Sequence, residues 1–574
     1  MVPAGSHAAD SPFAPCGGNG LLCATLTVPL DYGGQAPGAV SLHVEELPAA
    51  GTPRGVMLLL AGGPGQASAR VFDLGVDASF WQAFFPGYTL VAYDDRGTGD
   101  SGALDCASVR TISACADSIG PNRIFYSTHE HAEDIESIRV ALGVDKLALF
   151  GGSYGTEHAY AYALAHPDHV ERLLLDSVVA LPRDPYGLAS LQAIPNALRS
   201  ICAAGGCPTA GRDVGADFAA LANRLVARPP ESGFDGRFLV SLAYLSDIMA
   251  GVAAELPAAT EAGRSGNLGP LERLIVLAAG ATGSNRASVN PALELATDCA
   301  DGPFPWAPDD SKDARLTELE SSLAALPAGS TGLFGPWATE VSASLAFACT
   351  DWPAPSGSSG PAPGPLPDVP VLMLSGDRDV RTPTSGAAAL ASQFPQGHVL
   401  VVPGLGHFVI TRSPCAQDAV RGWLDGTVPP STCPRVPLPV PVVGAFRASV
   451  NATPPLGRGP IRVERTVAAA IATLRETLVP WLLSGGLPEA LPGLAGGSLV
   501  PGLTSFSLVS FSDVPGLELS GKVNLRVGSR PSTPVEISSA TLSVSGTQAV
   551  PGTLRVSGHT LRGLLAGRRV SAKL

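Results

Sequence analysis

Short apolar segments alternate with helical patterns over the first third of the chain. Among them, Thr128–Leu142 carries Ile135, Ile138 and Leu142 at helical spacing, and Thr128 can cap this helix. Regular alternation of fully apolar strands with helices is typical of a parallel sheet covered on both faces. We therefore predict an α/β core whose buried strands are Val56–Leu60, Thr89–Tyr93, Lys146–Phe150 and Arg172–Leu175.

The strand pattern stops near Val178 and resumes with Val369–Leu374 and His398–Val402. The intervening residues hold helical stretches such as Phe218–Val226, and they end in the linker-like Pro353–Pro367, which is rich in Pro, Gly and Ser. A sheet interrupted in this way indicates an inserted helical cap. We predict core segments at 1–177 and 366–435, with the cap at 178–365 between them.

A second Pro-rich segment, Pro434–Val443, follows the last core strand. Beyond it, 467–482 has the pattern of one amphipathic helix, and Leu517–Val527 and Val535–Val544 alternate apolar with polar residues. Such alternation is typical of half-exposed antiparallel strands. We predict a separate domain at 436–574, made of a helix and a β-rich part, with no catalytic constellation in it.

The sequence Gly151-Gly152-Ser153-Tyr154-Gly155 stands between a predicted strand and a helical pattern. In this context a G-x-S-x-G motif is typical of a nucleophile elbow, because the glycines permit close backbone approach and expose the serine hydroxyl. The alternative is a glycine-rich turn with an ordinary serine. We interpret Ser153 as the candidate nucleophile.

A serine hydroxyl needs a base, which a carboxylate usually orients. His407 lies in a glycine-rich loop after the strand His398–Val402 and is the candidate base, whereas His398 begins that strand and fits a structural role. Asp377 and Asp379 both follow the preceding strand, where the acid is expected. Their position alone does not decide which of the two aspartates orients His407.

Acyl transfer also needs hydrogen-bond donors for the oxyanion. The segment Ala61–Gly65 (AGGPG) follows the first long strand, where one donor is expected. Gly63 can donate its N–H, whereas Pro64 has none. The second donor should be the N–H of Tyr154, the residue after the nucleophile.

Motifs shared with one known family extend from Cys16 to Cys433. They are Val28–Tyr32, Gly62–Gly65, Asp94–Ser101, Gly151–Thr156, Asp298–Pro303 and Cys349–Pro353. In this combination the chain resembles the prolyl and tripeptidyl aminopeptidases of the α/β-hydrolase fold, in particular the secreted tripeptidyl-aminopeptidase-like branch. The resemblance implies the Ser-Asp-His triad Ser153, Asp379 and His407, with Asp379 favoured because Thr382-Pro383 follows it.

An aminopeptidase must also hold the ammonium group of its substrate, so a carboxylate should face the pocket. Asp301 and Asp298 in the cap are candidates, and Glu157, just after the nucleophile, is a third; plain surface acids are the alternative. The chain departs from the family at Glu157-His158 and at Ala61, where prolyl aminopeptidases have His. These departures bear on substrate choice more than on reaction type.

We therefore predict an exported serine hydrolase, and we favour an aminopeptidase that releases short peptides or residues from peptide amino ends. The alternative is a carboxylesterase acting on small or medium acyl esters, because amide and ester hydrolysis use the same triad. A non-catalytic binder on a hydrolase scaffold is disfavoured by the complete set of catalytic elements.

Charge is unevenly distributed along the chain. The formal net charge is −13, yet residues 436–574 hold 13 Lys or Arg against 6 Asp or Glu. The acidic total argues against a nucleic-acid-binding protein. No segment has the length and apolar composition of a transmembrane helix. We hypothesise that the basic domain contacts the acidic body or an anionic cell surface.

The ten cysteines follow one another as five neighbouring pairs, which is typical of local disulfides in an oxidising compartment; reduced core cysteines are the alternative. No secretory leader precedes Cys16, so we expect a secreted or extracytoplasmic protein whose leader is not part of this sequence. We predict no metal or cofactor, because ligand spacings and a dinucleotide fingerprint are lacking. The expected pairs are Cys16 with Cys23, Cys106 with Cys115, Cys202 with Cys207, Cys299 with Cys349, and Cys415 with Cys433.

Overall fold

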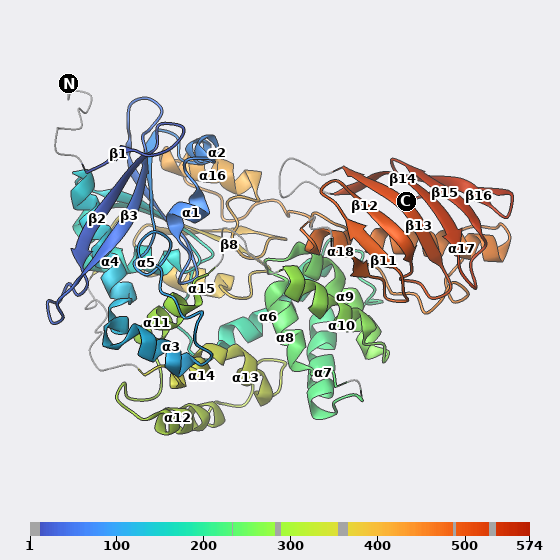
Figure 1. Ribbon diagram of the computed structural model, residues 1–574, viewed down its shortest axis with the longest axis horizontal. Helices are drawn as coiled ribbons and strands as arrows, with labels where there is room; N and C mark the ends of the chain where they lie inside the picture. The colour runs from blue at the N-terminus through green and yellow to red at the C-terminus, as the bar shows by residue number, and fades with distance from the viewer. Residues whose placement is uncertain (1–11, 232, 282–288, 354–364, 486–488, 527–534) are drawn as a thin grey trace.

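The computed structural model describes residues 12–231, 233–281, 289–353, 365–485, 489–526 and 535–574. Two β-sheets lie at opposite ends of the long axis, with a group of helices between them (Figure 1). Sheet A has the strand order β1-β2-β3-β5-β4-β6-β7-β8-β9, and sheet B runs in chain order from β10 to β17. Most of the linker expected at 353–367 lies outside the described residues.

Sheet A is parallel from β5 to β9 and has three antiparallel strands at its other edge. The predicted α/β core is confirmed, with strand ends shifted by one or two residues. The antiparallel strands β1 to β3 were not predicted, because their residues are only partly buried. The strands are β1 Ala14–Pro15, β2 Leu22–Pro29, β3 Ala39–Leu47, β4 Gly55–Leu60, β5 Tyr88–Tyr93, β6 Leu147–Gly152, β7 Val170–Asp176, β8 Val371–Gly376 and β9 Gly397–Val402.

Helices cover both faces of sheet A. Apolar residues of α1, α2 and α16 pack on one face, and those of α4, α5 and α15 pack on the other. Helix α4 has the predicted bounds, but its N-cap is Ser127, whose hydroxyl accepts the Glu130 N–H; Thr128 is the first helical residue. The helices are α1 Ser68–Phe72, α2 Ala78–Phe84, α3 Ile112–Ile119, α4 Thr128–Leu142, α5 Gly155–Ala165, α15 Thr384–Ala391 and α16 Pro414–Leu424.

The expected helical cap is inserted between β7 and β8, and it lies over the carboxyl ends of the parallel strands (Figure 1). All five expected disulfides are present, which is consistent with an extracytoplasmic protein. The cap helices are α6 Leu188–Cys202, α7 Val214–Ala227, α8 Arg237–Leu245, α9 Ala250–Arg264, α10 Gly269–Ala281, α11 Pro291–Asp301, α12 Lys312–Ala324, α13 Thr339–Ser342 and α14 Ser344–Thr350.

Sheet B is an antiparallel meander with one apolar face, which α17 (Ile461–Glu476) and α18 (Leu478–Leu483) cover. In the described residues, 461–483 is the single stretch that is apolar and long enough to cross a membrane. Of its 18-residue apolar window, 78% is buried in the structure, as in the core helix of a globular domain. The strands are β10 Leu491–Pro492, β11 Ser498–Pro501, β12 Ser505–Phe511, β13 Glu518–Arg526, β14 Glu536–Ser545, β15 Gly552–Ser557, β16 Thr560–Leu565 and β17 Arg568–Lys573.

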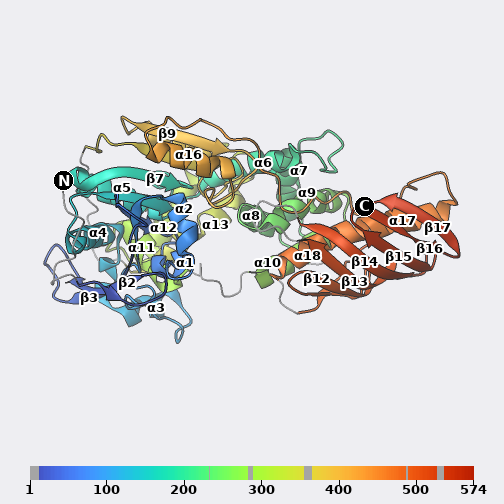
Figure 2. The ribbon, with the colours of Figure 1, turned by 90° about the horizontal axis from the view of Figure 1, so that it is seen from above.

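The cap and the sheet B region share one continuous hydrophobic core. Figure 2 shows the cap helices α8 to α10 next to α18 and sheet B. At its centre, Arg273 of α10 forms ion pairs with Glu255 of α9 (3.1 Å) and with Asp513, which follows β12 (2.7 Å). All three side chains are buried. The contact between residues 1–435 and 436–574 is thus an apolar core with one buried ion-pair network at its centre. In that network, Arg273 from the acidic part of the chain pairs with Asp513 from the basic part.

We predict that Arg273→Leu destabilises the protein by about 3–5 kcal/mol, because it leaves two buried carboxylates without their cation. Urea unfolding would measure the loss. Arg264→Leu is the matched control, since Arg264 pairs with Glu261 and Asp217 nearer the surface, and it should cost less than about 1 kcal/mol. Equal losses in the two variants would show that the buried network has no special role.

Candidate active site

Ser153 stands in a strained turn between β6 and α5. Its φ is 55°, a value that L-residues rarely adopt, and its N–H donates to the carbonyl of Asp176 (2.9 Å). A Cβ on Gly155 would overlap the carbonyl oxygen of Leu60, so only glycine fits beneath the turn. This is the geometry of a nucleophile elbow.

Asp379 and His407 are brought together at the ends of β8 and β9. Asp379 Oδ2 lies 3.0 Å from His407 Nδ1, and the carboxylate also accepts the N–H and hydroxyl of Thr382. Burial opposes ionisation of Asp379, but His407 and the Thr382 hydrogen bonds outweigh it and lower the pKa. The carboxylate therefore stays ionised beside the imidazole.

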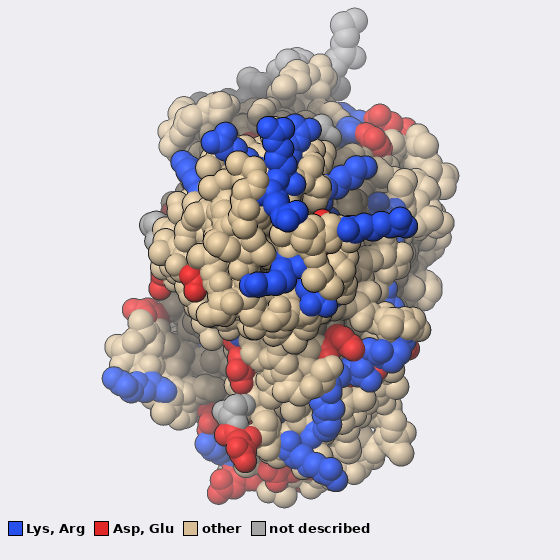
Figure 3. Space-filling view, turned by 90° about the vertical axis from the view of Figure 1, so that its right-hand side faces the viewer, with Lys and Arg blue, Asp and Glu red and all other residues tan. Residues whose placement is uncertain are grey.

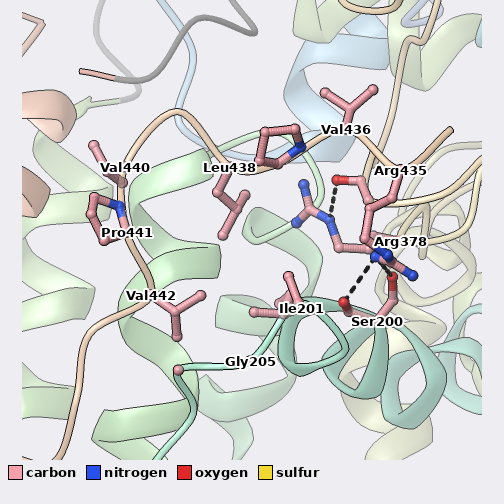
Figure 4. Close-up of a pocket in the computed structure, with 14 residues that line it drawn as sticks. Ser200, Ile201, Gly205, Arg378, Arg435, Val436, Leu438, Val440, Pro441 and Val442 are labelled. Carbon is pink, nitrogen blue, oxygen red and sulfur yellow. Dashed lines mark hydrogen bonds between the residues drawn. The ribbon is translucent and has the colours of Figure 1, made fainter. Parts of the chain in front are cut away.

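Asp377 points into a different environment. Its carboxylate accepts the Gly404 N–H (2.7 Å) and the Ser200 hydroxyl (2.7 Å) and pairs with Arg435 (3.2 Å). Figure 4 shows Ser200 and Arg435 beside a cavity of about 400 Å³ between α6 and the Pro-rich segment after β9. Asp377 thus ties the cap to the core, and no hydrogen bond of the described residues joins it to His407.

Two buried groups at the end of β7 fix the loop that carries His407. Asp176 accepts the N–H groups of Val409 and Ile410, and the Ser177 hydroxyl accepts the Phe408 N–H (2.7 Å). Burial raises the pKa of Asp176 to about 6. The sequence analysis missed this role; the only available signal was an acid at the end of an apolar strand.

The cap also contacts this loop, through the turn between α8 and α9. The carbonyl of Asp247 accepts the His407 N–H (3.1 Å), and its carboxylate pairs with Arg381 (2.9 Å). A Cβ on Gly406 would overlap the Asp247 backbone, so the residue before His407 must be glycine. The catalytic loops therefore rest on the cap as well as on the sheet.

Ser153 and His407 both line a cavity of about 800 Å³ between the cap and sheet A. Gly63 and Tyr154, the expected oxyanion donors, line it too, and no hydrogen bond of the described residues uses their N–H groups. Nor does a hydrogen bond join the Ser153 hydroxyl to His407 within the described chain; such contacts often tighten only when substrate binds.

Arg183, where the cap begins, binds two of the three candidate ammonium ligands. It pairs with Glu157 of α5 (2.7 Å) and with Asp298 of α11 (2.5 Å), and its guanidinium lies over the Tyr154 ring. Asp298 lines the cavity, whereas Glu157 is not among the lining residues. The single guanidinium of Arg183 thus pairs with two carboxylates, those of Glu157 and Asp298, so the three side chains include more acidic groups than basic ones.

Asp301 lies behind Tyr154, away from the cavity lining. Its carboxylate accepts the N–H and hydroxyl of Thr128, and the Thr128 hydroxyl contacts the Tyr154 hydroxyl (2.5 Å). Burial raises the pKa of Asp301 to about 7. Asp301 thus links the cap to the side chain of Tyr154, the expected oxyanion donor.

Glu294, which the sequence analysis missed, lines the cavity one helical turn before Asp298. It has no ion-pair partner in the part of the chain that the structure describes. Burial and the neighbouring Asp298 raise its pKa to about 7. The only sequence signal was the spacing of four residues on one helix, which became informative once the cap placed that face over Ser153.

A buried histidine pair lies between α4 and α5, where three possible metal ligands meet. Asp95, His131 and His158 come close together, and all three are buried. However, His131 Nδ1 and His158 Nε2 are only 2.6 Å apart, whereas two nitrogens about 2.0–2.1 Å from one tetrahedral ion lie roughly 3.3 Å apart. The geometry fits a hydrogen bond between the rings better than a shared ion.

Known proteins match both the core and the cap. Residues 55–239 match the model of the alpha/beta hydrolase fold, and residues 335–433 match the model of TAP-like proteins. The chain is a serine hydrolase of the α/β-hydrolase fold. Serine protease Hip1 from Mycobacterium tuberculosis is 27% identical over 468 residues, covering 72% of this chain and 86% of that protein.

A second relative of the hydrolase is the tripeptidyl aminopeptidase of Streptomyces lividans, which is 24% identical over 483 residues and covers 72% of this chain and 85% of its own. Both relatives are peptidases by name. The expected resemblance to the tripeptidyl-aminopeptidase-like group is thereby confirmed, and these relatives support a hydrolase of the peptidase type.

We predict that Asp379→Asn lowers kcat by about 10⁴-fold, because His407 loses the carboxylate that orients it. Asp377→Asn is the matched control and should leave kcat within a few-fold of the wild type, since Asp377 faces Ser200 and Arg435. Steady-state hydrolysis of a peptide anilide measures both. A larger loss of kcat in Asp377→Asn than in Asp379→Asn would identify Asp377 as the acid of the triad.

Proposed function

We propose that the hydrolase is an exported serine aminopeptidase that releases short peptides or residues from the amino ends of peptides. The observation that carries the proposal is Glu294, a carboxylate without an ion-pair partner among the described residues, in the same cavity as Ser153. A substrate ammonium group bound there would sit at one end of the cavity. Its distance from Ser153 would then set the length of the released fragment.

In the proposed mechanism, Ser153 Oγ attacks the scissile carbonyl while His407 takes its proton. The N–H groups of Gly63 and Tyr154 stabilise the oxyanion, and Asp379 orients the imidazole and stabilises its charged form. His407 then protonates the leaving amine. A water, activated by His407, hydrolyses the acyl-enzyme.

Carboxylesterase activity is the second candidate. Part of the cavity wall is apolar, with Phe72, Ile248 and Phe408 among the lining residues, and it would accept an acyl chain. Ester hydrolysis needs the same triad but no carboxylate for an ammonium group, so Glu294 favours the peptidase.

The disulfides and the peptidase relatives support export to an extracytoplasmic location, where such bonds persist. We further propose that the basic C-terminal domain contacts an anionic cell surface there. The net positive charge of residues 436–574 supports this contact.

A substrate panel tests the function. Peptide anilides with a free amino end should be hydrolysed about tenfold or more faster, as kcat/KM, than the same peptides with an acetylated amino end, because acetylation removes the cation. Short acyl esters form the third arm. Activity on esters alone would favour the carboxylesterase, and indifference to acetylation would exclude the aminopeptidase.

Glu294→Gln should raise KM for free-amine peptides about tenfold or more and leave kcat nearly unchanged, because a hydrogen bond between charged groups is lost. In the wild type KM should fall as the pH rises through about 7, where Glu294 ionises, and Glu294→Gln should abolish this dependence. Glu320→Gln, an exposed change on α12, is the control. An unchanged KM in Glu294→Gln would remove Glu294 from substrate recognition.

A further inference from the structure

The solvent-facing side of sheet B carries a group of basic residues, here called the basic face: Lys522, Arg555, Arg562, Arg569 and Lys573. All five side chains are exposed. On β13, β15 and β16 they alternate with residues such as Val523, Leu554 and Leu561, which are buried on the face toward α17. Figure 3 shows basic side chains gathered on this end of the molecule, with few acidic ones among them.

The cross-strand register aligns the basic face in rows. Arg555 stands directly opposite Arg562 on β16, and Lys522 stands two strands away, opposite Thr541, which is itself opposite Arg555. Neighbouring strands lie about 4.7–4.9 Å apart. The row therefore presents three cations within about 15 Å of sheet.

Like charges directly opposite one another destabilise a sheet. No carboxylate offsets them here, because none of the five basic residues has an ion-pair partner in the described part of the chain, and the nearby Glu536 pairs with Arg526 instead. Protection of a sheet edge explains basic residues on β17. It does not explain Lys522, Arg555 and Arg562, which lie on interior strands.

The rows beside the cations are hydroxyl-rich. Ser557 faces Thr560 and Ser539, and Thr553 faces Ser543, so hydroxyl groups flank Arg555 on both sides. Hydroxyls and guanidinium forks together suit a sugar polymer that bears acidic groups. A bilayer would call for several apolar or aromatic anchors, and single-stranded nucleic acid for aromatic platforms. The rows formed by β13 to β17 hold one exposed apolar side chain, Leu564 opposite Thr553 and Arg569, and no aromatic residue.

We propose that the basic face binds an anionic glycopolymer of the cell surface, a linear polysaccharide with carboxylate or phosphate groups along its length. This inference sharpens the anionic contact proposed above and is independent of the peptidase assignment. The bound polymer would lie across β13 to β16, with its acidic groups on Lys522, Arg555 and Arg562. The enzyme would thereby work next to the surface that carries its substrates.

The test compares the full-length protein with the double variant Arg555→Ser/Arg562→Ser, since serine already occupies this face. Its control is Arg458→Ser/Arg462→Ser, which removes two exposed charges near the start of α17, on the other side of the sheet. The probes are polygalacturonate, neutral dextran, vesicles of phosphatidylglycerol and phosphatidylcholine, and oligothymidylate. Binding is followed by calorimetry at several salt concentrations, with peptide anilide hydrolysis measured in parallel.

We expect the wild type and the control to bind polygalacturonate but not dextran, with affinity that falls as salt rises. The variant at Arg555 and Arg562 should bind about tenfold or more weakly, with a shallower salt dependence and unchanged anilide hydrolysis. Equal weakening in both variants would mean a diffuse charge effect and would overturn the proposal. Tighter binding to vesicles or oligothymidylate than to polygalacturonate would overturn it too, and loss of anilide hydrolysis in all proteins would strike the proposed function alone.

Discussion

The active site depends on the ion pairs of Arg183. This one side chain joins Glu157, in the first turn after Ser153, to Asp298 in the cap, and it covers the Tyr154 ring. A buried ion pair adds little stability, but it fixes geometry, because each charge must stay with its partner. The cap is thereby held over Ser153, and Glu294 lies on the cavity wall without an ion-pair partner among the described residues.

The cap accordingly supports the loops of the proposed triad as well as covering the cavity. The carbonyl of Asp247 holds the backbone of His407, and the Asp247 carboxylate holds Arg381, two residues after Asp379. A shift of the cap would move both loops together.

Much of this arrangement could be predicted from the sequence, because its signals are local. Buried strands are continuous apolar runs, and the elbow at Ser153 has a motif that follows from backbone crowding. Asp379 could be distinguished from Asp377 only through the resemblance, since both follow the same strand. Glu294 could not be found, because its role depends on which carboxylates Arg183 neutralises, and that pairing joins parts of the chain more than a hundred residues apart.

The excess of basic residues in 436–574 does not explain how this domain contacts the rest of the chain. It suggested attraction between the basic domain and the acidic body, but their contact is an apolar core around Arg273. The sequence shows which positions are apolar but not which part of the protein covers them. The shared core could therefore not be predicted from the sequence. The excess basic residues are left for the outer face of sheet B.

The shared core also sets an order of events during folding. The cap is synthesised long before 436–574, yet its apolar side is covered only when α18 and sheet B arrive. Chains grow at about 5–20 residues per second. The apolar side of the cap therefore stays uncovered for many seconds, because the nascent enzyme cannot bury it until residues 436–574 have been synthesised.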